Sequence, residues 1–176
     1  MRYKALLLVM IVVGTSLLIL ASAPSEVKAA PHDPIFIESD AELESMADAE
    51  GWVGSGSAVD PFIIENYVID ANNASNGILI RNIDHHIVIR NCVVHNTSDD
   101  VFIPSGDGIY LASVENATIE GCEVYDAFDG IGLYECKDIL VKGNDLHDNR
   151  NNGVDVGKGS RVRVTENVCS NNSFRL

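Results

Sequence analysis

Two aspartates, Asp107 and Asp129, each stand directly before the glycine of a Gly-Ile-x-Leu stretch. Carboxyl groups about 5 Å apart could bind calcium or could act as the acid and base that cleave a glycosidic bond. Any aspartate repeated on stacked strands would give that distance. Asn76 and Asn152 fill the same place before other glycines, as expected of a turn that needs a short polar residue there. The pattern favours a structural corner, with calcium binding and catalysis as alternatives.

Three side chains with rings, His95, Tyr125 and His147, recur at one position of a repeated unit. If the units stack as neighbouring strands do, the two histidines lie about 10 Å apart, too far to share a metal ion without another ligand. The pattern favours a solvated polar face, with a sugar-binding strip or a weak metal site as alternatives. A hydrolase would combine two aspartates with a histidine, so the candidate catalytic residues are Asp107, Asp129 and His147.

Aromatic residues also indicate a surface for binding. Residues 97–106 interrupt the repeat and include Phe102, and a loop on a regular scaffold tends to carry recognition. Tyr110 and Tyr134 are expected to point outward beside it, with a gap at Gly132 between them. Rings next to aspartates suit carbohydrate. The predicted ligand-binding residues are Phe102, Tyr110, Tyr125, Tyr134 and His95.

Four cysteines are present. Cys92 and Cys122 fall at one position of the repeat, which would bring their Cα atoms to about 5 Å, within the range of a disulfide. Parallel side chains in a stack often miss the required torsion, so a disulfide and two free thiols both stay open. Cys136 and Cys169 are predicted to be small apolar residues, and the spacing matches no zinc motif. We predict no cofactor, apart from the calcium alternative.

The repeated unit predicts the fold. Stretches of the type Gly-Ile-x-Leu begin at Gly108, Gly130 and Gly153, at spacings of 22 and 23 residues, and an earlier copy begins at Gly77. Each unit continues with two further short strands of alternating apolar residues, separated by Asn, Asp and Gly. This pattern predicts an all-β fold, a right-handed parallel β-helix of about five turns.

Alternation along each strand predicts which side chains point inward. The inward columns are Ile78, Ile109, Ile131 and Val154; Ile80, Leu111, Leu133 and Val156; and Ile89, Ile119, Val141 and Val164. Asn144 and Asn167 fall at one corner, where buried amides can bond to each other along the stack.

Three segments follow from this frame. Residues 1–30 have the pattern of a signal peptide, because basic residues precede an apolar run that is shorter than a membrane span of about 20 residues. We expect a secreted or cell-surface protein, with an uncleaved anchor as the alternative. Residues 31–60 are predicted to form an N-terminal cap with a helix over 41–50, begun by Ser39 or Asp40.

The β-helix is predicted over residues 61–176, and its period continues to the last residues. An open strand edge invites pairing with other chains, so we expect further turns, an anchor or end-to-end self-association there. Export would also permit glycosylation at Asn-x-Ser/Thr, although chance matches are expected in a chain rich in Asn. These stretches begin at Asn73, Asn96, Asn116 and Asn171.

Charge excludes one class of partner. The chain has 12 Lys and Arg against 26 Asp and Glu, a net charge of −14. Binding a nucleic acid requires a basic surface that this chain lacks. We therefore expect no nucleic-acid partner and a carbohydrate or protein partner instead.

The stretches of residues 34–37 and 54–65, together with the Gly-Ile-x-Leu repeats, resemble exported right-handed β-helix proteins of the NosD-like group. The resemblance covers about residues 33–171. The group is similar also to pectate lyases and polysaccharide epimerases, and it includes surface proteins with no established reaction. The resemblance implies the fold and leaves the activity open, and it adds the alternative of copper-site maturation, which is associated with NosD itself.

These patterns favour an exported or cell-surface β-helix module with a non-catalytic binding or structural role toward carbohydrate or a protein. The alternative is an enzyme that acts on a polysaccharide, a lyase, epimerase or hydrolase. A lyase would need an Arg or Lys base beside an acidic cluster. The outward basic residues Arg90, Lys142 and Arg163 fall on different turns, none opposite the two aspartates.

Overall fold

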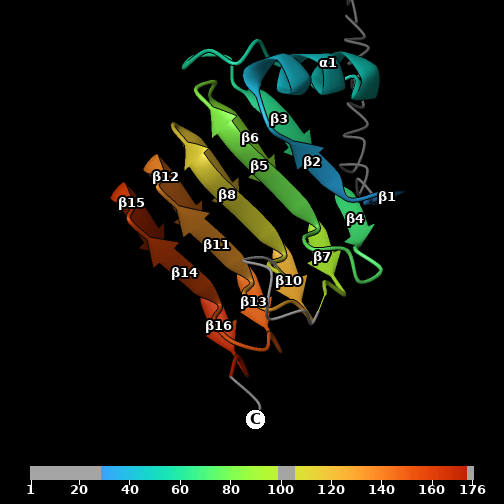
Figure 1. The fold of residues 1–176 in the computed structure, drawn as a ribbon, viewed down its shortest axis with the longest axis vertical. Helices are drawn as coiled ribbons and strands as arrows, with labels where there is room; N and C mark the ends of the chain where they lie inside the picture. Colours follow the sequence, from blue (N-terminus) through green and yellow to red (C-terminus); the bar gives the residue numbers. More distant parts are fainter. Residues whose placement is uncertain (1–28, 99–105, 174–176) are drawn as a thin grey trace, which may run out of the picture.

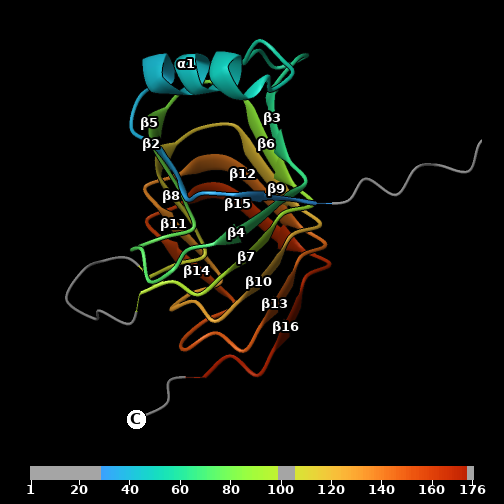
Figure 2. The ribbon, with the colours of Figure 1, turned by 90° about the vertical axis from the view of Figure 1, so that its right-hand side faces the viewer.

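The computed structural model describes residues 29–98 and 106–173. In this range the chain forms three parallel sheets wound around one apolar core, with a helix across one end (Figure 1, Figure 2). The predicted parallel β-helix is confirmed. Residues 1–28, which hold most of the predicted signal peptide, and Phe102 lie outside the described residues. No helix within the described ranges is long and apolar enough to cross a membrane.

Each turn of the coil contributes strands to three sheets. Sheet A consists of β1 (Ala30–His32), β4 (Tyr67–Asp70), β7 (Val93–His95), β10 (Glu123–Tyr125), β13 (Asp145–His147) and β16 (Val168–Ser170). Sheet B consists of β2 (Ile35–Ile37), β5 (Ile78–Ile83), β8 (Ile109–Val114), β11 (Ile131–Tyr134) and β14 (Val154–Gly157). Sheet C consists of β3 (Phe62–Glu65), β6 (Ile87–Arg90), β9 (Ala117–Glu120), β12 (Lys137–Lys142) and β15 (Ser160–Thr165).

The register places equivalent residues of successive turns side by side. Ile131 of β11, for example, lies between Ile109 of β8 and Val154 of β14. Before the last turn, the predicted inward residues are all at most 1% exposed. In the last turn Val156 is 43% and Val164 is 46% exposed, because no further described turn packs against them. The inward columns predicted from alternation therefore form the core.

Left-handed backbone at the corners explains the Asn, Asp and Gly between the strands. The corner from sheet C to sheet A has one such residue per turn, with φ between 53° and 63°: Asn66, Asn91, Gly121, Gly143 and Glu166. Asn, Asp and Gly adopt this conformation at the least cost. The asparagines of the four Asn-x-Ser/Thr stretches also have φ between 54° and 64°. Backbone geometry thus accounts for these asparagines without a glycan.

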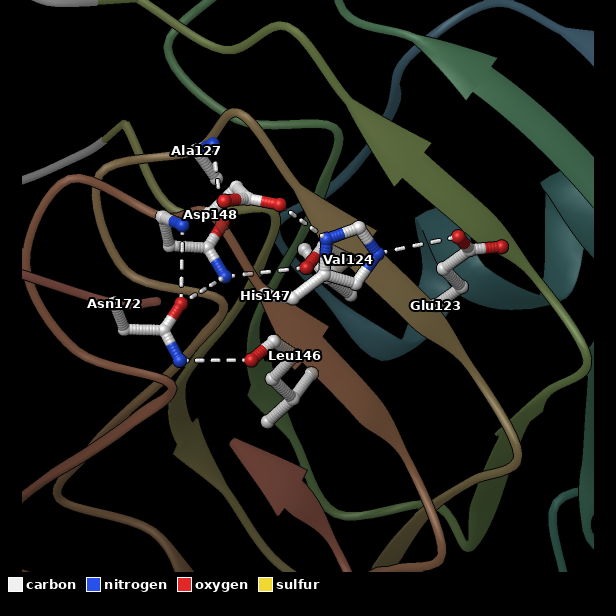
Figure 3. Close-up of polar contacts among 8 residues, drawn as sticks. Glu123, Val124, Ala127, Leu146, His147, Asp148 and Asn172 are labelled. Carbon is white, nitrogen blue, oxygen red and sulfur yellow. Dashed lines mark hydrogen bonds and ion pairs between the residues drawn. The ribbon is translucent and has the colours of Figure 1, made fainter. Parts of the chain in front are cut away.

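Stacked amides hold two corners. The predicted ladder is present: Asn144 Nδ2 donates to Asn167 Oδ1 at 2.8 Å, and Asn144 Oδ1 accepts from the Cys122 N–H at 2.9 Å. A second ladder, not predicted, joins Asn149 to Asn172, whose Nδ2 donates to the Leu146 carbonyl at 2.7 Å (Figure 3). Each amide satisfies backbone groups that the corner would otherwise leave unpaired.

The helix α1 (Asp40–Glu50) covers the N-terminal end of the coil (Figure 1). Ser39 caps it, with its hydroxyl accepting from the Glu42 N–H at 3.3 Å, and Gly51 ends it at φ 70°. Leu43 and Ala47 are its buried residues. The predicted capping helix is confirmed, beginning one residue earlier than expected.

Candidate functional site

Asp107 and Asp129 stand one above the other at the corner that leads into sheet B, and each is only 6% exposed. Asp129 Oδ1 accepts from the Asn152 N–H at 2.7 Å and from Asn151 Nδ2 at 3.0 Å. These are the hydrogen bonds of a turn. Asp129 therefore has the role that the sequence pattern favoured, that of a polar residue that stabilises a corner.

The carboxyl group of Asp107 lies against the outer surface of Gly132. A Cβ atom at Gly132 would stand 1.9 Å from Asp107 Oδ2 and 2.9 Å from the Tyr110 ring. The predicted gap at Gly132 is therefore wrong, because the Asp107 carboxyl fills it. Glycine is needed here for that close approach.

The environment of Asp107 disfavours its charged form. Burial is the largest cause, the charge of Asp129 is the next, and together they raise the pKa of Asp107 to about 7. Burial also raises the pKa of Asp129, while the Asn152 N–H opposes the rise. The charge of Asp155, on the neighbouring strand β14, further raises the pKa of Asp107 and the pKa of Asp129. Asp107 thus keeps its proton to a higher pH than an ordinary aspartate does.

The outward side chains of sheet B form a partly apolar row. The register puts Phe36, Leu79, Tyr110, Gly132 and Asp155 in one column. Phe36 is 42% exposed, and Tyr134, in the next outward column, is 39% exposed. We call Phe36, Leu79, Tyr110, Tyr134 and Asp155 the sheet B face. Its two tyrosines were predicted from the sequence pattern, whereas Phe36 and Leu79 were not.

A cation borders this face at Tyr134. Lys158 Nζ donates to the Tyr134 hydroxyl at 2.6 Å and lies 4.8 Å from the centroid of the ring. Lys158 also bonds to Glu135 at 3.1 Å. The ammonium group is therefore already paired with a carboxylate and fixes the tyrosine from the outer side.

The segment that interrupts the repeat leaves and returns at one place beside this corner. The Thr97 hydroxyl donates to the Gly106 carbonyl, which brings the two ends of the segment together. Arg150 Nη2 donates to the carbonyls of Thr97 and Ser98 at 3.0 and 2.8 Å. Arg150, which sequence analysis did not single out, thus fastens the base of the segment. Phe102, its predicted binding residue, lies outside the described residues.

His95, Tyr125 and His147 form the predicted outward column, on sheet A. The rings of His95 and Tyr125 stack at 4.9 Å with 5° between their planes, and those of Tyr125 and His147 at 5.3 Å and 10°. His147 Nδ1 lies 2.9 Å from Asp148 Oδ2, and Nε2 lies 3.2 Å from Glu123 Oε1 (Figure 3). Both ring nitrogens are thus occupied on sheet A, and the bonds of His147 do not join it to the buried aspartates.

The hydrogen bond to the Asp148 carboxylate is the largest cause that raises the pKa of His147, and the bond to Glu123 raises it further, while burial lowers it. A metal ion has no ready place here. Within residues 29–98 and 106–173, no group of three or more His, Cys, Asp or Glu side chains could hold one.

The four cysteines are free thiols. Cys92 and Cys122 stack as predicted, but each thiol points to backbone carbonyls: Cys92 Sγ donates to Arg90 at 3.4 Å and Cys122 Sγ to Glu120 at 3.6 Å. The disulfide left open by the sequence is not formed. Cys136 is buried as expected, whereas Cys169, in the last turn, is exposed.

Comparison with known families gives the class of the protein. A family model described as right handed beta helix region matches residues 45–175, so the chain belongs to the right-handed β-helix family. No curated protein and no solved structure matches the chain. The match gives the fold family and no reaction.

Proposed function

We propose that the protein is an exported, non-catalytic β-helix module that binds a neutral oligosaccharide along the sheet B face. The observation that carries this proposal is the outward row itself, in which Phe36, Leu79 and Tyr110 follow one another on adjacent strands with Tyr134 alongside. Neighbouring strands are about 4.8 Å apart. A sugar chain laid along the coil axis can therefore place the apolar sides of its rings on several of these side chains. Export rests on the signal pattern of residues 1–30.

Charge supports a neutral ligand over an acidic one. Asp107 and Asp129 border the face, and the charges of Asp129 and of Asp155 on the face already disfavour the ionised form of Asp107. The cations beside it are engaged, Arg81 with Glu38 and Lys158 with Glu135. A uronate chain would bring further carboxylates against this set, while Arg81 and Lys158, the cations described beside this face, are already paired with carboxylates.

Burial argues for binding without catalysis. A general acid or base must reach the reacting atom, and Asp107 and Asp129 are each only 6% exposed. The basic residues Arg90, Lys142 and Arg163 belong to strands of sheet C, away from this face. The lyase alternative thus lacks its base at the sheet B face.

One observation favours a second function, glycosidic-bond cleavage. Asp107 has a pKa of about 7, which suits a general acid. In that case Asp107 would protonate the leaving oxygen while Asp129 accepts a proton from the attacking water. The donor set does not favour copper-site maturation, because the thiols of Cys92, Cys122 and Cys136 are buried.

The test is a panel of neutral and uronate oligosaccharides titrated against the protein by calorimetry, with product analysis on the same samples. We expect a neutral chain to bind. Tyr110→Ala should lower its affinity about five-fold, because one ring contact contributes about 1 kcal/mol. Tyr125→Ala, on sheet A, should leave the affinity unchanged. Equal loss in both variants, or preference for uronates, would contradict the proposal. Product formation abolished in both Asp107→Asn and Asp129→Asn would instead establish the second function.

A further inference from the structure

His147 is held by carboxylates from two successive turns of the coil. Glu123 belongs to β10, the strand before β13 in sheet A, and Asp148 follows His147 directly at the corner. Figure 3 shows the imidazole lying between the two carboxylates, with one ring nitrogen directed at each. The contact to Glu123 therefore joins two turns through side chains, in addition to the backbone ladder between them.

A neutral imidazole cannot make both contacts as a donor. Only the imidazolium carries a proton on each nitrogen, and a carboxylate can only accept. After loss of one proton, a nitrogen lone pair faces a carboxylate oxygen and repels it. The Glu123 contact is the longer of the two, 3.2 Å against 2.9 Å, so it is the first to open.

We propose that His147 is a pH-operated clamp between β10 and β13, closed as the imidazolium and released when the ring loses its proton. The ring stack assists the closed form, because a cation stacked on Tyr125 at 5.3 Å gains the attraction of its π-system. His95 supports Tyr125 from the other side at 4.9 Å. The proposal is independent of the ligand proposed for sheet B.

Three carboxylates around the ring, those of Asp148, Glu123 and Asp145, favour the cation. Glu123 and Tyr125 face it from β10, Asp145 precedes it on β13, and Asp148 and Asp126 stand at the corners of the two turns. The pKa of His147 is raised, first by Asp148 and then by Glu123. On the other side of β13 the register puts Ser170 of β16 beside His147.

The pH direction follows from linkage. A base whose pKa is higher folded than unfolded stabilises the fold fully below its unfolded pKa, about 6.5, and this contribution is lost as pH rises through the folded pKa. The release should be local, because β16 beyond β13 has exposed residues such as Val168, 59% exposed. Raising the pH should therefore loosen β13 and β16 before the rest of the coil.

The test has two measurements on the full chain. The ring titration of His147 is followed by NMR, and amide exchange of β13 and β16 is measured below and above its midpoint, corrected for intrinsic exchange. We expect the midpoint to fall in Asp148→Asn and by less in Glu123→Gln, and amide protection of β13 to drop several-fold across it in the native protein. Glu120→Gln, which removes a carboxylate from sheet C, should change neither result.

A midpoint that is unchanged in both carboxylate variants would overturn the clamp. So would a loss of amide protection that persists in His147→Gln, because that side chain cannot titrate. If His147→Gln fails to fold, the two carboxylate variants still decide the question, since each leaves the imidazole in place.

Discussion

Asp107 beside sheet B and His147 on sheet A both have raised pKa values, but for opposite reasons. Burial is the largest cause at Asp107 and acts against its charged form. At His147 the largest cause is a hydrogen bond to a carboxylate, which acts for the charged form, while burial opposes it. The comparison shows that the ionised carboxyl group of Asp107 lowers the stability of the fold at the corner of sheet B. On sheet A, the charge of His147 and its carboxylate partners raises that stability.

By linkage, both groups make the fold less stable as pH rises, but replacing them should change the stability in opposite directions. Asp107 is destabilising once ionised, so stability falls as pH rises from about 3.8 in the unfolded chain to about 7 in the folded one. His147 stabilises while protonated, and that contribution is also lost as pH rises. Removing Asp107 should therefore help the fold at high pH, and removing His147 should harm it at low pH.

The largest effect concerns the scaffold that both sites share. Ile119 of β9 is fully buried, so Ile119→Asp puts an unpaired charge into the core and should cost more than about 4 kcal/mol, enough to unfold the coil. Its neighbour Thr118 points outward, and Thr118→Asp should cost less than about 1 kcal/mol. Urea unfolding followed by circular dichroism measures both, and equal sensitivity would break the assignment of inward and outward columns.

The next effect tests the cost at Asp107. Asp107→Asn keeps the shape of the carboxyl group and removes its charge, so at pH 8 it should raise the free energy of unfolding by on the order of 3 kcal/mol. At pH 4 the native carboxyl is already protonated, and the gain should vanish. Asp48→Asn on the exposed side of α1 is the matched control, because it removes a carboxylate away from Asp107, and it should have a small effect at both pH values. A gain of equal size at pH 4 would show that charge is not its cause.

A smaller effect tests how Asp107 is placed. Gly132→Ala sets a Cβ atom 1.9 Å from Asp107 Oδ2, and relieving that overlap should cost about 1–3 kcal/mol. Because the atom that must move belongs to Asp107, the cost should shrink when Gly132→Ala is combined with Asp107→Ala. Urea unfolding of the two single variants and the double variant forms the cycle. Additive costs would mean that the Tyr110 ring, rather than the carboxyl, restricts this position.

The repeat made much of the fold predictable, because one period sets both the register and the direction of every side chain. It failed where the period is broken. Ile35 pairs with Ile78 across the inserted cap, so Phe36 could not be placed in the outward row by counting 22 or 23 residues. The second amide ladder was within reach, since Asn149 and Asn172 repeat the spacing of Asn144 and Asn167.

The contacts at the two sites depended on side-chain conformation, which the period does not specify. Spacing placed Asp107 before a turn, but not its carboxyl group over Gly132, where the absence of a side chain draws it. Spacing likewise stacked His147 on Tyr125, but the choice of Glu123 and Asp148 as partners depends on rotamers. The sequence thus predicts which residues stack in one column, but it does not predict which side chains of different columns bond to each other.

The smallest effect completes the comparison. His147→Gln removes an imidazolium that is partly exposed and paired with two carboxylates, so it should lower the free energy of unfolding at pH 5.5 by about 0.2–1 kcal/mol. The loss should shrink as pH rises, because the native imidazole then also lacks its charge. It should shrink with added salt as well, since the contacts lie near the surface. Unfolding in urea at pH 5.5 and pH 9, at low and high salt, measures both trends. An equal loss of the free energy of unfolding at both pH values would mean that His147 stabilises the fold through ring stacking alone. His147 and Asp107 would then differ in how they pack, and not in how their charges affect stability.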